Sequence, residues 1–322
     1  MYPIADMHCD TISCKITATD GAVRLAQNSG HIDLNKLKIG GSLLECFAIY
    51  IPAEDSQDNP HHLGAYGFYH AALADFKREM EENRDTIGQV SCCADIEHNR
   101  AAGKLCALLS VEDGMPIDGK IERVDEMYGD GVRMVALTWN YENSIGYPNR
   151  WPETSMQGLK PFGIETVRRM NELGMIVDVS HLSDGGFYDV VKYCTKPFVA
   201  SHSNARAQCD VVRNLSDDML KLIGDAGGVI GLNFCAGFLV KGREDKAYTA
   251  DIVRHARHIA DKAGVETLGF GSDFDGIGND LEFTDASGMQ QVMQALERCF
   301  TPRELELISH KNVLRVIADN CG

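Results

Sequence analysis

Short runs of β-branched and apolar residues alternate along the chain with longer segments that have the hydrophobic spacing of amphipathic helices. Eight such runs are expected to form strands: Pro3–His8, Ser42–Ile51, Leu105–Val111, Val132–Thr138, Met175–Val179, Phe198–Ser201, Gly228–Phe234 and Thr267–Ser272. Helical periodicity is clearest in Ala65–Asn83, Lys160–Leu173, Asp217–Asp225 and Thr249–Ala263. Strand–helix alternation repeated eight times predicts an α/β fold, a TIM-type (β/α)8 barrel with the helices outside.

No low-complexity linker or block of like charge interrupts this pattern, so we expect a single domain over residues 1–322. The longer connections, Pro52–Leu63, Trp139–Leu159 and Cys235–Ala247, are interpreted as ordered loops. Loops that follow the strands of a parallel barrel form its active site. Candidate chemistry is therefore sought at the ends of the predicted strands.

Side chains that can bind a metal occur at the ends of five predicted strands. They are His8 and Asp10 after the first strand, Glu112 after the third, His181 after the fifth, His202 after the sixth and Asp273 after the eighth. Residues two apart on a strand point the same way, so His8 and Asp10 share a face. Each placement alone is weak evidence, but their joint occurrence is the strongest signal in the sequence.

Three imidazoles and three carboxylates suit zinc, manganese or iron better than calcium. A carboxylate can bridge two ions, and two ions about 3.5–4 Å apart can hold a hydroxide between them and polarise a carbonyl. Asp273 is then placed to take the proton of the water and pass it to a leaving amine. Strand alternation alone does not decide between Glu112 and its neighbour Asp113.

The other titratable residues near these strand ends are interpreted as structural. Asp113 is expected to be a loop or cap residue, and Asp275 to stabilise the turn before Gly276. Asp178 is expected to face away from Ser180 as a core or supporting carboxylate. The remaining histidines are expected at the surface: His31, His61, His62, His70, His98, His255, His258 and His310.

Composition narrows the class of partner. The chain has 31 Lys and Arg against 47 Asp and Glu, a formal net charge of −16, which disfavours nucleic acid and anionic membranes as partners. Its eleven cysteines form no C-x-x-C pair, and no secretion signal or membrane span is recognisable. These features predict a soluble cytoplasmic enzyme with a small-molecule substrate.

With these motifs in place, the chain resembles the membrane (renal) dipeptidase family, the zinc dipeptidases of peptidase family M19, and among them a soluble bacterial-type member. The resemblance runs from His8-Cys-Asp-Thr11 to Asn312-Val-Leu-Arg-Val316. Its most specific pieces are Ser110-Val-Glu-Asp-Gly114, Val177-Asp-Val-Ser-His-Leu182, Ser201-His-Ser203, Val212-Arg-Asn-Leu-Ser-Asp217 and Gly271-Ser-Asp-Phe-Asp-Gly276.

The resemblance implies a barrel with two zinc ions. His8 and Asp10 would hold one ion, His181 and His202 the other, and Glu112, rather than Asp113, would bridge them. Arg213 would bind the terminal carboxylate of the substrate, for which a guanidinium fork is well suited. Asp273 would handle the water and the leaving amine, and a homodimer is expected from the family.

The sequence departs from animal members of the family after the fourth strand. Those members carry a histidine that contacts the substrate, whereas Leu137-Thr-Trp-Asn-Tyr-Glu-Asn143 places Trp139 at the aligned position. An indole N–H donates a hydrogen bond but does not titrate. Either Trp139, Asn140 or a neighbouring loop residue takes over this contact, or the substrate range differs.

The sequence therefore predicts a metal-dependent dipeptidase that hydrolyses dipeptides through a hydroxide bridging two zinc ions. The main alternative is a related amidohydrolase acting on N-acyl amino acids, lactams or cyclic amides, which would share the metal site. A non-catalytic metal- or peptide-binding protein is less favoured, because a binder does not need both a two-metal ligand set and Asp273. A structural barrel with incidental polar strand ends is the remaining alternative.

Overall fold

Eight parallel strands close into a barrel in the computed structural model, which describes residues 1–19 and 21–322. In order around the barrel they are β1 (Ile4–Cys9), β2 (Ser42–Tyr50), β4 (Leu105–Glu112), β5 (Val132–Ala136), β6 (Ile176–Asp178), β7 (Val199–Ala200), β8 (Val229–Leu232) and β10 (Leu268–Phe270). Asp6 of β1 pairs with Phe270 of β10, so strands from opposite ends of the chain close the ring. The predicted (β/α)8 barrel is confirmed.

Each of the eight predicted apolar runs overlaps one barrel strand; β1 and β4 end one residue later than predicted, and several other strands are shorter than predicted. Three further strands were not predicted. β3 (Ile87–Val90) pairs with the first half of β4, and β9 (Lys246–Ala247) pairs with β11 (Asp280–Leu281) in a separate two-stranded sheet. These strands are two to four residues long, too short to give a recognisable hydrophobic period.

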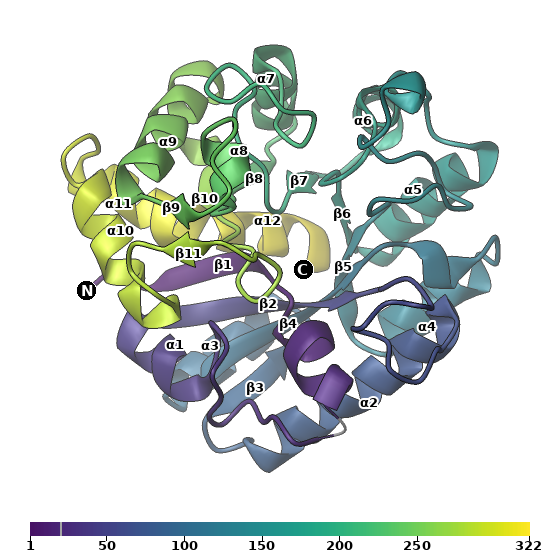
Figure 1. Ribbon diagram of the computed structural model, residues 1–322, viewed down its shortest axis with the longest axis horizontal. Helices are drawn as coiled ribbons and strands as arrows, with labels where there is room; N and C mark the ends of the chain where they lie inside the picture. The colour runs from purple at the N-terminus through teal and green to yellow at the C-terminus, as the bar shows by residue number, and fades with distance from the viewer. Residues whose placement is uncertain (20) are drawn as a thin grey trace.

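Helices surround the strands, as Figure 1 shows. They are α1 (Leu34–Gly40), α2 (Ala65–Glu82), α3 (Cys93–Ala101), α4 (Glu122–Gly129), α5 (Pro161–Leu173), α6 (Asp184–Tyr193), α7 (Asp217–Asp225), α8 (Ala236–Leu239), α9 (Thr249–Ala263), α10 (Met289–Leu296), α11 (Pro302–Glu306) and α12 (Asn312–Cys321). The four helical segments predicted from periodicity correspond to α2, α5, α7 and α9, with ends that agree within one residue.

The amino-terminal end of the barrel is filled with apolar side chains and covered by α12. Val313, Val316 and Ile317 of this helix pack with strand residues such as Met7 and Leu108. Along β4 the inner positions change from the apolar Leu108 to the polar Glu112 at the carboxyl end. One end of the barrel is thus a sealed core, and the other is available for chemistry.

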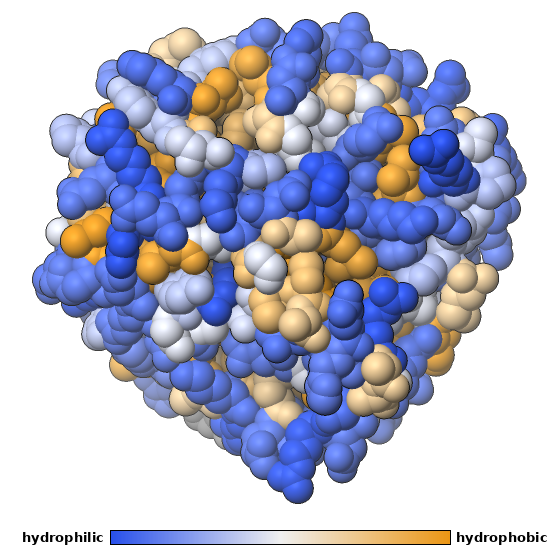
Figure 2. Space-filling view, turned by 180° about the vertical axis from the view of Figure 1, so that it is seen from behind, coloured by the Kyte–Doolittle hydropathy of each residue, from blue (hydrophilic) through white to orange (hydrophobic). Residues whose placement is uncertain are grey.

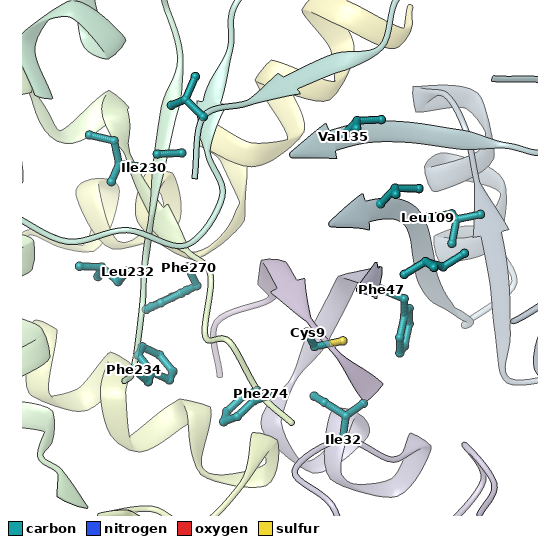
Figure 3. Close-up of a cluster of buried hydrophobic side chains, with 14 of the residues drawn as sticks. Cys9, Ile32, Phe47, Leu109, Val135, Ile230, Leu232, Phe234, Phe270 and Phe274 are labelled. Carbon is teal, nitrogen blue, oxygen red and sulfur yellow. The ribbon is translucent and has the colours of Figure 1, made fainter. Parts of the chain in front are cut away.

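A second apolar layer lies between the strands and the surrounding helices. Figure 3 shows part of this layer, with Phe47 and Leu109 on one side and Ile230, Leu232 and Phe270 on the other. All five side chains are fully buried. Because the strands are packed on both faces, their carboxyl ends are held at fixed distances from one another.

Hydrophilic side chains cover most of the face seen from behind, and apolar residues appear there in separate patches (Figure 2). Among the described residues, no helix combines the length and the apolar character needed to cross a membrane.

Two histidines predicted at the surface are buried, His255 on α9 and His310. His255 is fully buried; its Nδ1 accepts a hydrogen bond from the backbone N–H of Ala205 at 3.1 Å, and its Nε2 lies 3.0 Å from the carbonyl oxygen of Leu239. Burial lowers the pKa of His255 to about 4. The neutral ring satisfies both contacts, because one nitrogen accepts and the other donates.

The barrel interior is narrow beside the end of β7. A Cβ on Gly271 would lie 1.7 Å from the carbonyl oxygen of Ser201, and one on Gly231 would lie 1.9 Å from the same oxygen. A Cβ on Gly271 would also come within 3.1 Å of the Cα of His202. Glycine is therefore required where β8 and β10 approach the backbone that carries His202.

We expect the free energy of unfolding to fall as the pH decreases from about 6.5 toward 4. In this range His255 is protonated in the unfolded chain but stays neutral in the folded one, so acid favours unfolding. The contribution of His255 to the free energy of unfolding that is lost over this pH range amounts to about 3 kcal/mol. His255→Gln should be less stable at neutral pH yet show a shallower pH dependence in urea unfolding under the same metal conditions. The exposed His98→Gln serves as control. Equal pH slopes for wild type and His255→Gln would contradict the assignment.

Gly271→Ala should lower the free energy of unfolding by about 1–3 kcal/mol or more, because the added methyl group overlaps a backbone carbonyl that has no room to move. Urea unfolding measures the change. Gly129→Ala is the matched control, since nothing lies within 4 Å of its Cβ position on α4. That variant should be as stable as wild type or more stable by up to about 1 kcal/mol. Comparable losses in both variants would rule out the steric explanation.

Candidate active site

Glu112 lies at the centre of the polar residues at the carboxyl end of the barrel. Its Oε2 is 3.3 Å from Nε2 of His8, whereas its Oε1 is 2.9 Å from Nε2 of His181 and 3.3 Å from Nε2 of His202. The two oxygens of one carboxylate therefore face two different sets of imidazoles. All four side chains are buried, and Nε2 of His181 lies only 3.0 Å from Nε2 of His202.

Asp10 and Asp273 complete the cluster on the side of His8. Oδ2 of Asp10 is 3.4 Å from Nε2 of His8, and the three residues each offer a ligand atom within 4.8 Å of the others. Oδ2 of Asp273 accepts a hydrogen bond from the side chain of Asn233 at 2.8 Å. A Cβ on Gly276 would lie 2.0 Å from Oδ2 of Asp10 and 2.6 Å from Oδ1 of Asp273, so glycine leaves these oxygens room.

Two of the clustered residues adopt backbone conformations that are costly for a side chain. His181 has φ 66° and Asp273 has φ 65°, in the left-handed region. Such conformations cost of order 1–3 kcal/mol and are found where a functional geometry requires them. Each residue lies three positions beyond a strand end, His181 after β6 and Asp273 after β10, in the loops at the carboxyl end of the barrel.

Burial controls the charges of the cluster. It raises the pKa of the Asp10 carboxyl to about 8, against the opposing charge of His8, and it raises the pKa of Asp273. Burial lowers the pKa of His181 to about 4 and that of His202 well below its ordinary value. At neutral pH these last two rings are therefore uncharged, the form in which an imidazole binds a metal.

The donor atoms of this cluster fit divalent cations. Among the described residues, Nε2 of His8 and Oδ1 of Asp10 are buried without a hydrogen-bond partner. The buried carboxyl groups of Asp10 and Glu112 and the half-buried one of Asp273 lie in this cluster, and metal ions would supply the positive charge that buried carboxylates need. Mixed nitrogen and oxygen donors are typical of zinc and other transition metals.

Arg213 is buried at the edge of the same cluster. It donates to the carbonyl oxygen of His202 at 3.3 Å and to the hydroxyl of Ser203 at 3.5 Å, and its guanidinium lies 5.2 Å from the ring centre of Phe238. Its Nε has no hydrogen-bond partner among the described residues. Burial lowers the pKa of Arg213 from its usual value. A buried guanidinium with an unused donor is suited to binding an anionic group of a ligand.

A cleft of about 500 Å³ opens over the cluster. Its lining includes Asp10, Glu112, His181, Arg213 and Asp273 together with Trp139 and Asn140. The ring of Trp139 meets Tyr50 edge-on, with the ring centres 4.8 Å apart. Oδ1 of Asn140 lies 3.4 Å from Nδ1 of His181. Every residue predicted for the site is thus at the cleft or directly below it.

The sequence interpretation missed several residues of the cleft. Tyr50 at the end of β2, Asp58 in the following loop, and Cys235 after β8 all line it, and Asn233 holds Asp273. Tyr50 and Asn233 lie at or directly beyond strand ends, so strand-end position could have identified them. Asp58 has no comparable signal, since it lies in an irregular loop.

The residues interpreted as structural have specific partners. Asp113 accepts hydrogen bonds from the backbone N–H groups of Met115 and Trp139, which anchors the loop that carries Trp139. The turn interpretation of Asp275 was too local: its carboxylate accepts from Thr11 at 2.7 Å and from the backbone N–H of His31 at 2.6 Å. Asp275 therefore ties three chain segments together beside the site.

A parallel barrel with buried imidazoles and carboxylates at the carboxyl ends of its strands is typical of metal-dependent hydrolases. A family model described as membrane dipeptidase, peptidase family M19, matches residues 1–320. The chain belongs to this family, and it is a metal-dependent hydrolase.

Several similar proteins support this assignment. An uncharacterised protein of Klebsiella pneumoniae is 35% identical, covering 72% of this chain and 89% of its own length. An uncharacterised dipeptidase of Schizosaccharomyces pombe is 31% identical, covering 89% and 72% respectively. The crystal structure of a metallopeptidase from Rhodobacter sphaeroides, liganded with a phosphinate mimic of the dipeptide L-Ala-D-Ala, is 26% identical over 99% of both chains, with a TM-score of 0.91.

Proposed function

We propose that this protein is a dipeptidase with two zinc ions. His8 and Asp10 would hold one ion, His181 and His202 would hold the other, and Glu112 would bridge them. The supporting observation is the central position of Glu112, each of whose oxygens faces a different imidazole set, at 2.9–3.3 Å. When bound, the ions would supply Lewis acidity and lower the pKa of water to about 7.

Arg213 would set the orientation of the substrate by binding its terminal carboxylate. The guanidinium is buried beside His202, so a carboxylate paired with it is placed at a fixed distance from the cluster. In this buried position a charge-assisted pair is stronger than in water. The requirement for a free carboxyl group next to the scissile amide favours dipeptides, in agreement with the dipeptide mimic bound to the Rhodobacter sphaeroides protein.

Asp273 would move the proton. Asn233 donates to its Oδ2, which fixes the carboxylate and leaves Oδ1 beside Asp10 and Gly276 at the cleft. From there Asp273 would take the proton of the attacking water and deliver it to the nitrogen of the leaving amine. Trp139 and Tyr50 would form an aromatic wall along the substrate, and Asn140 would support His181.

Purified protein reloaded with zinc should release amino acids from a panel of dipeptides. Asp273→Asn should retain the metal content of the wild type but lose kcat by roughly 10²–10⁴-fold, since it removes the general base and keeps the shape. Metal analysis and amino-acid release on the same samples measure both quantities. A protein that cleaves N-acyl amino acids or cyclic amides but no dipeptide belongs to the alternative class. Full activity in Asp273→Asn would remove this residue from proton transfer.

Arg213→Ala should lower kcat/KM for dipeptides by about 10- to 100-fold, mainly through KM, because a charged hydrogen-bonded pair is lost. Dipeptide C-terminal amides, which lack the carboxylate, provide the control: their kcat/KM should change little. Arg213→Lys keeps the charge without the planar fork and should give an intermediate value. An equal loss of kcat/KM on free and amidated dipeptides would mean that Arg213 supports the structure of the active site and does not bind the terminal carboxylate of the substrate.

A further inference from the structure

A chain of three buried side chains lies behind the ring of His202. Oγ of Ser201 is 2.5 Å from Oδ2 of Asp178 and 2.7 Å from Nδ1 of His202. Asp178 ends β6 and Ser201 directly follows β7, the neighbouring strand. All three residues are at most 1% exposed. The other ring nitrogen, Nε2, lies 3.3 Å from Oε1 of Glu112.

The partners of Asp178 determine the direction of every hydrogen bond in this chain. Its Oδ1 accepts from the backbone N–H groups of Ser180 and Ser201, each at 2.9 Å. An ionised carboxylate accepts hydrogen bonds and donates none, so the single hydroxyl proton of Ser201 goes to Oδ2 of Asp178. Oγ of Ser201 is then left as an acceptor toward His202. The ring must therefore donate from Nδ1, which in a neutral imidazole leaves the lone pair on Nε2.

We propose that Asp178 and Ser201 are positioning residues that hold His202 in the Nδ1–H tautomer, ready to bind a metal through Nε2. This inference rests on the proposed function, because it concerns a proposed metal ligand. Hydrogen bonds to the outer nitrogen of a histidine ligand generally fix its tautomer and orientation. Here the carboxylate acts through a serine hydroxyl from the adjacent strand.

The partner of His181 is weaker. Its Nδ1 faces a neutral amide oxygen, that of Asn140, at 3.4 Å, whereas the chain behind His202 ends on a carboxylate at short distances. A charge-assisted contact is stronger and shorter than a neutral one. His202 is therefore the histidine of this pair whose tautomer is fixed by the fold before any metal binds.

Asp178→Asn tests the proposal with almost no change in shape. Two backbone N–H groups point at the Oδ1 position, so the amide must place its oxygen there and its NH2 group toward Ser201. The hydroxyl proton of Ser201 is then free to turn toward His202, which favours the Nε2–H tautomer. This tautomer has no lone pair for a metal.

The first readout is the tautomer itself, measured by ¹⁵N NMR of histidine-labelled, metal-free protein. Wild type should show His202 protonated at Nδ1, and Asp178→Asn should show it protonated at Nε2. The second readout is zinc affinity by competition with a chelator, where Asp178→Asn should lose about 10- to 100-fold for the ion that His181 and His202 would hold. An unchanged tautomer in Asp178→Asn, or an unchanged zinc affinity, would overturn the proposal.

Ser180→Ala is the matched control. Its hydroxyl accepts from the backbone N–H of His202 at 3.2 Å and lies 3.3 Å from Oγ of Ser201, but it does not contact the ring nitrogen. The tautomer and the zinc affinity of this variant should remain close to those of wild type. A loss of zinc affinity equal to that of Asp178→Asn would mean that disturbed packing, and not the tautomer of His202, lowers the affinity. This result would overturn the role proposed for Asp178 and Ser201.

A second pair of variants decides the question if Asp178→Asn does not fold. Ser201→Thr keeps the hydroxyl and should retain the wild-type tautomer, whereas Ser201→Ala removes the acceptor and should lose zinc affinity. Equal affinity in the two variants would contradict the proposal. The NMR readout needs no metal, so a wild type that binds no zinc would end the proposed function and leave the tautomer result standing.

Discussion

The site depends on the buried carboxylate of Glu112, which must be within contact distance of imidazoles from three other strands. His8 reaches it from β1, His181 from the turn after β6, and His202 from the turn after β7. A flat sheet would spread these strands apart, since neighbouring strands lie about 4.8 Å from one another. Closing the sheet into a barrel brings their ends around one point. The closed barrel is therefore what places the imidazoles around one carboxylate.

Much of the fold follows from local pattern. The barrel strands are apolar on both faces over most of their length, so each appears in the sequence as a continuous apolar run. β3 was missed because Ile-Gly-Gln-Val has neither such a run nor an alternation. His255 was misjudged because the exposed Arg254 and Arg257 flank it in sequence, while its own side turns toward Ala205 and Leu239. Burial of one helical position depends on the rotation of the helix, which neighbours in sequence do not define.

The candidate site was predictable to the extent that it depends on strand ends. His8, Asp10, Glu112, His181 and His202 each follow an apolar run, and parallel topology alone brings them to one face. What was not predictable is which side chains touch at the strand ends. The predicted barrel already makes β6 a neighbour of β7 and β8 a neighbour of β10. The contacts from Asp178 through Ser201 to His202 and from Asn233 to Asp273 also require a register and side-chain directions that the sequence pattern leaves open by a few residues.

The way the barrel closes has a consequence for its synthesis. β1 carries His8 and leads directly into Asp10, yet its neighbour on one side is β10, more than 250 residues later, and α12 covers its amino-terminal end. A growing chain on the ribosome thus makes two of its five candidate metal ligands first, and nearly the whole polypeptide must follow before β10 and α12 can pack against them. Contacts of such large sequence separation slow folding. Until β10 is made, one edge of β1 lacks its strand partner, so we expect the candidate site to be one of the last parts of the molecule to be completed.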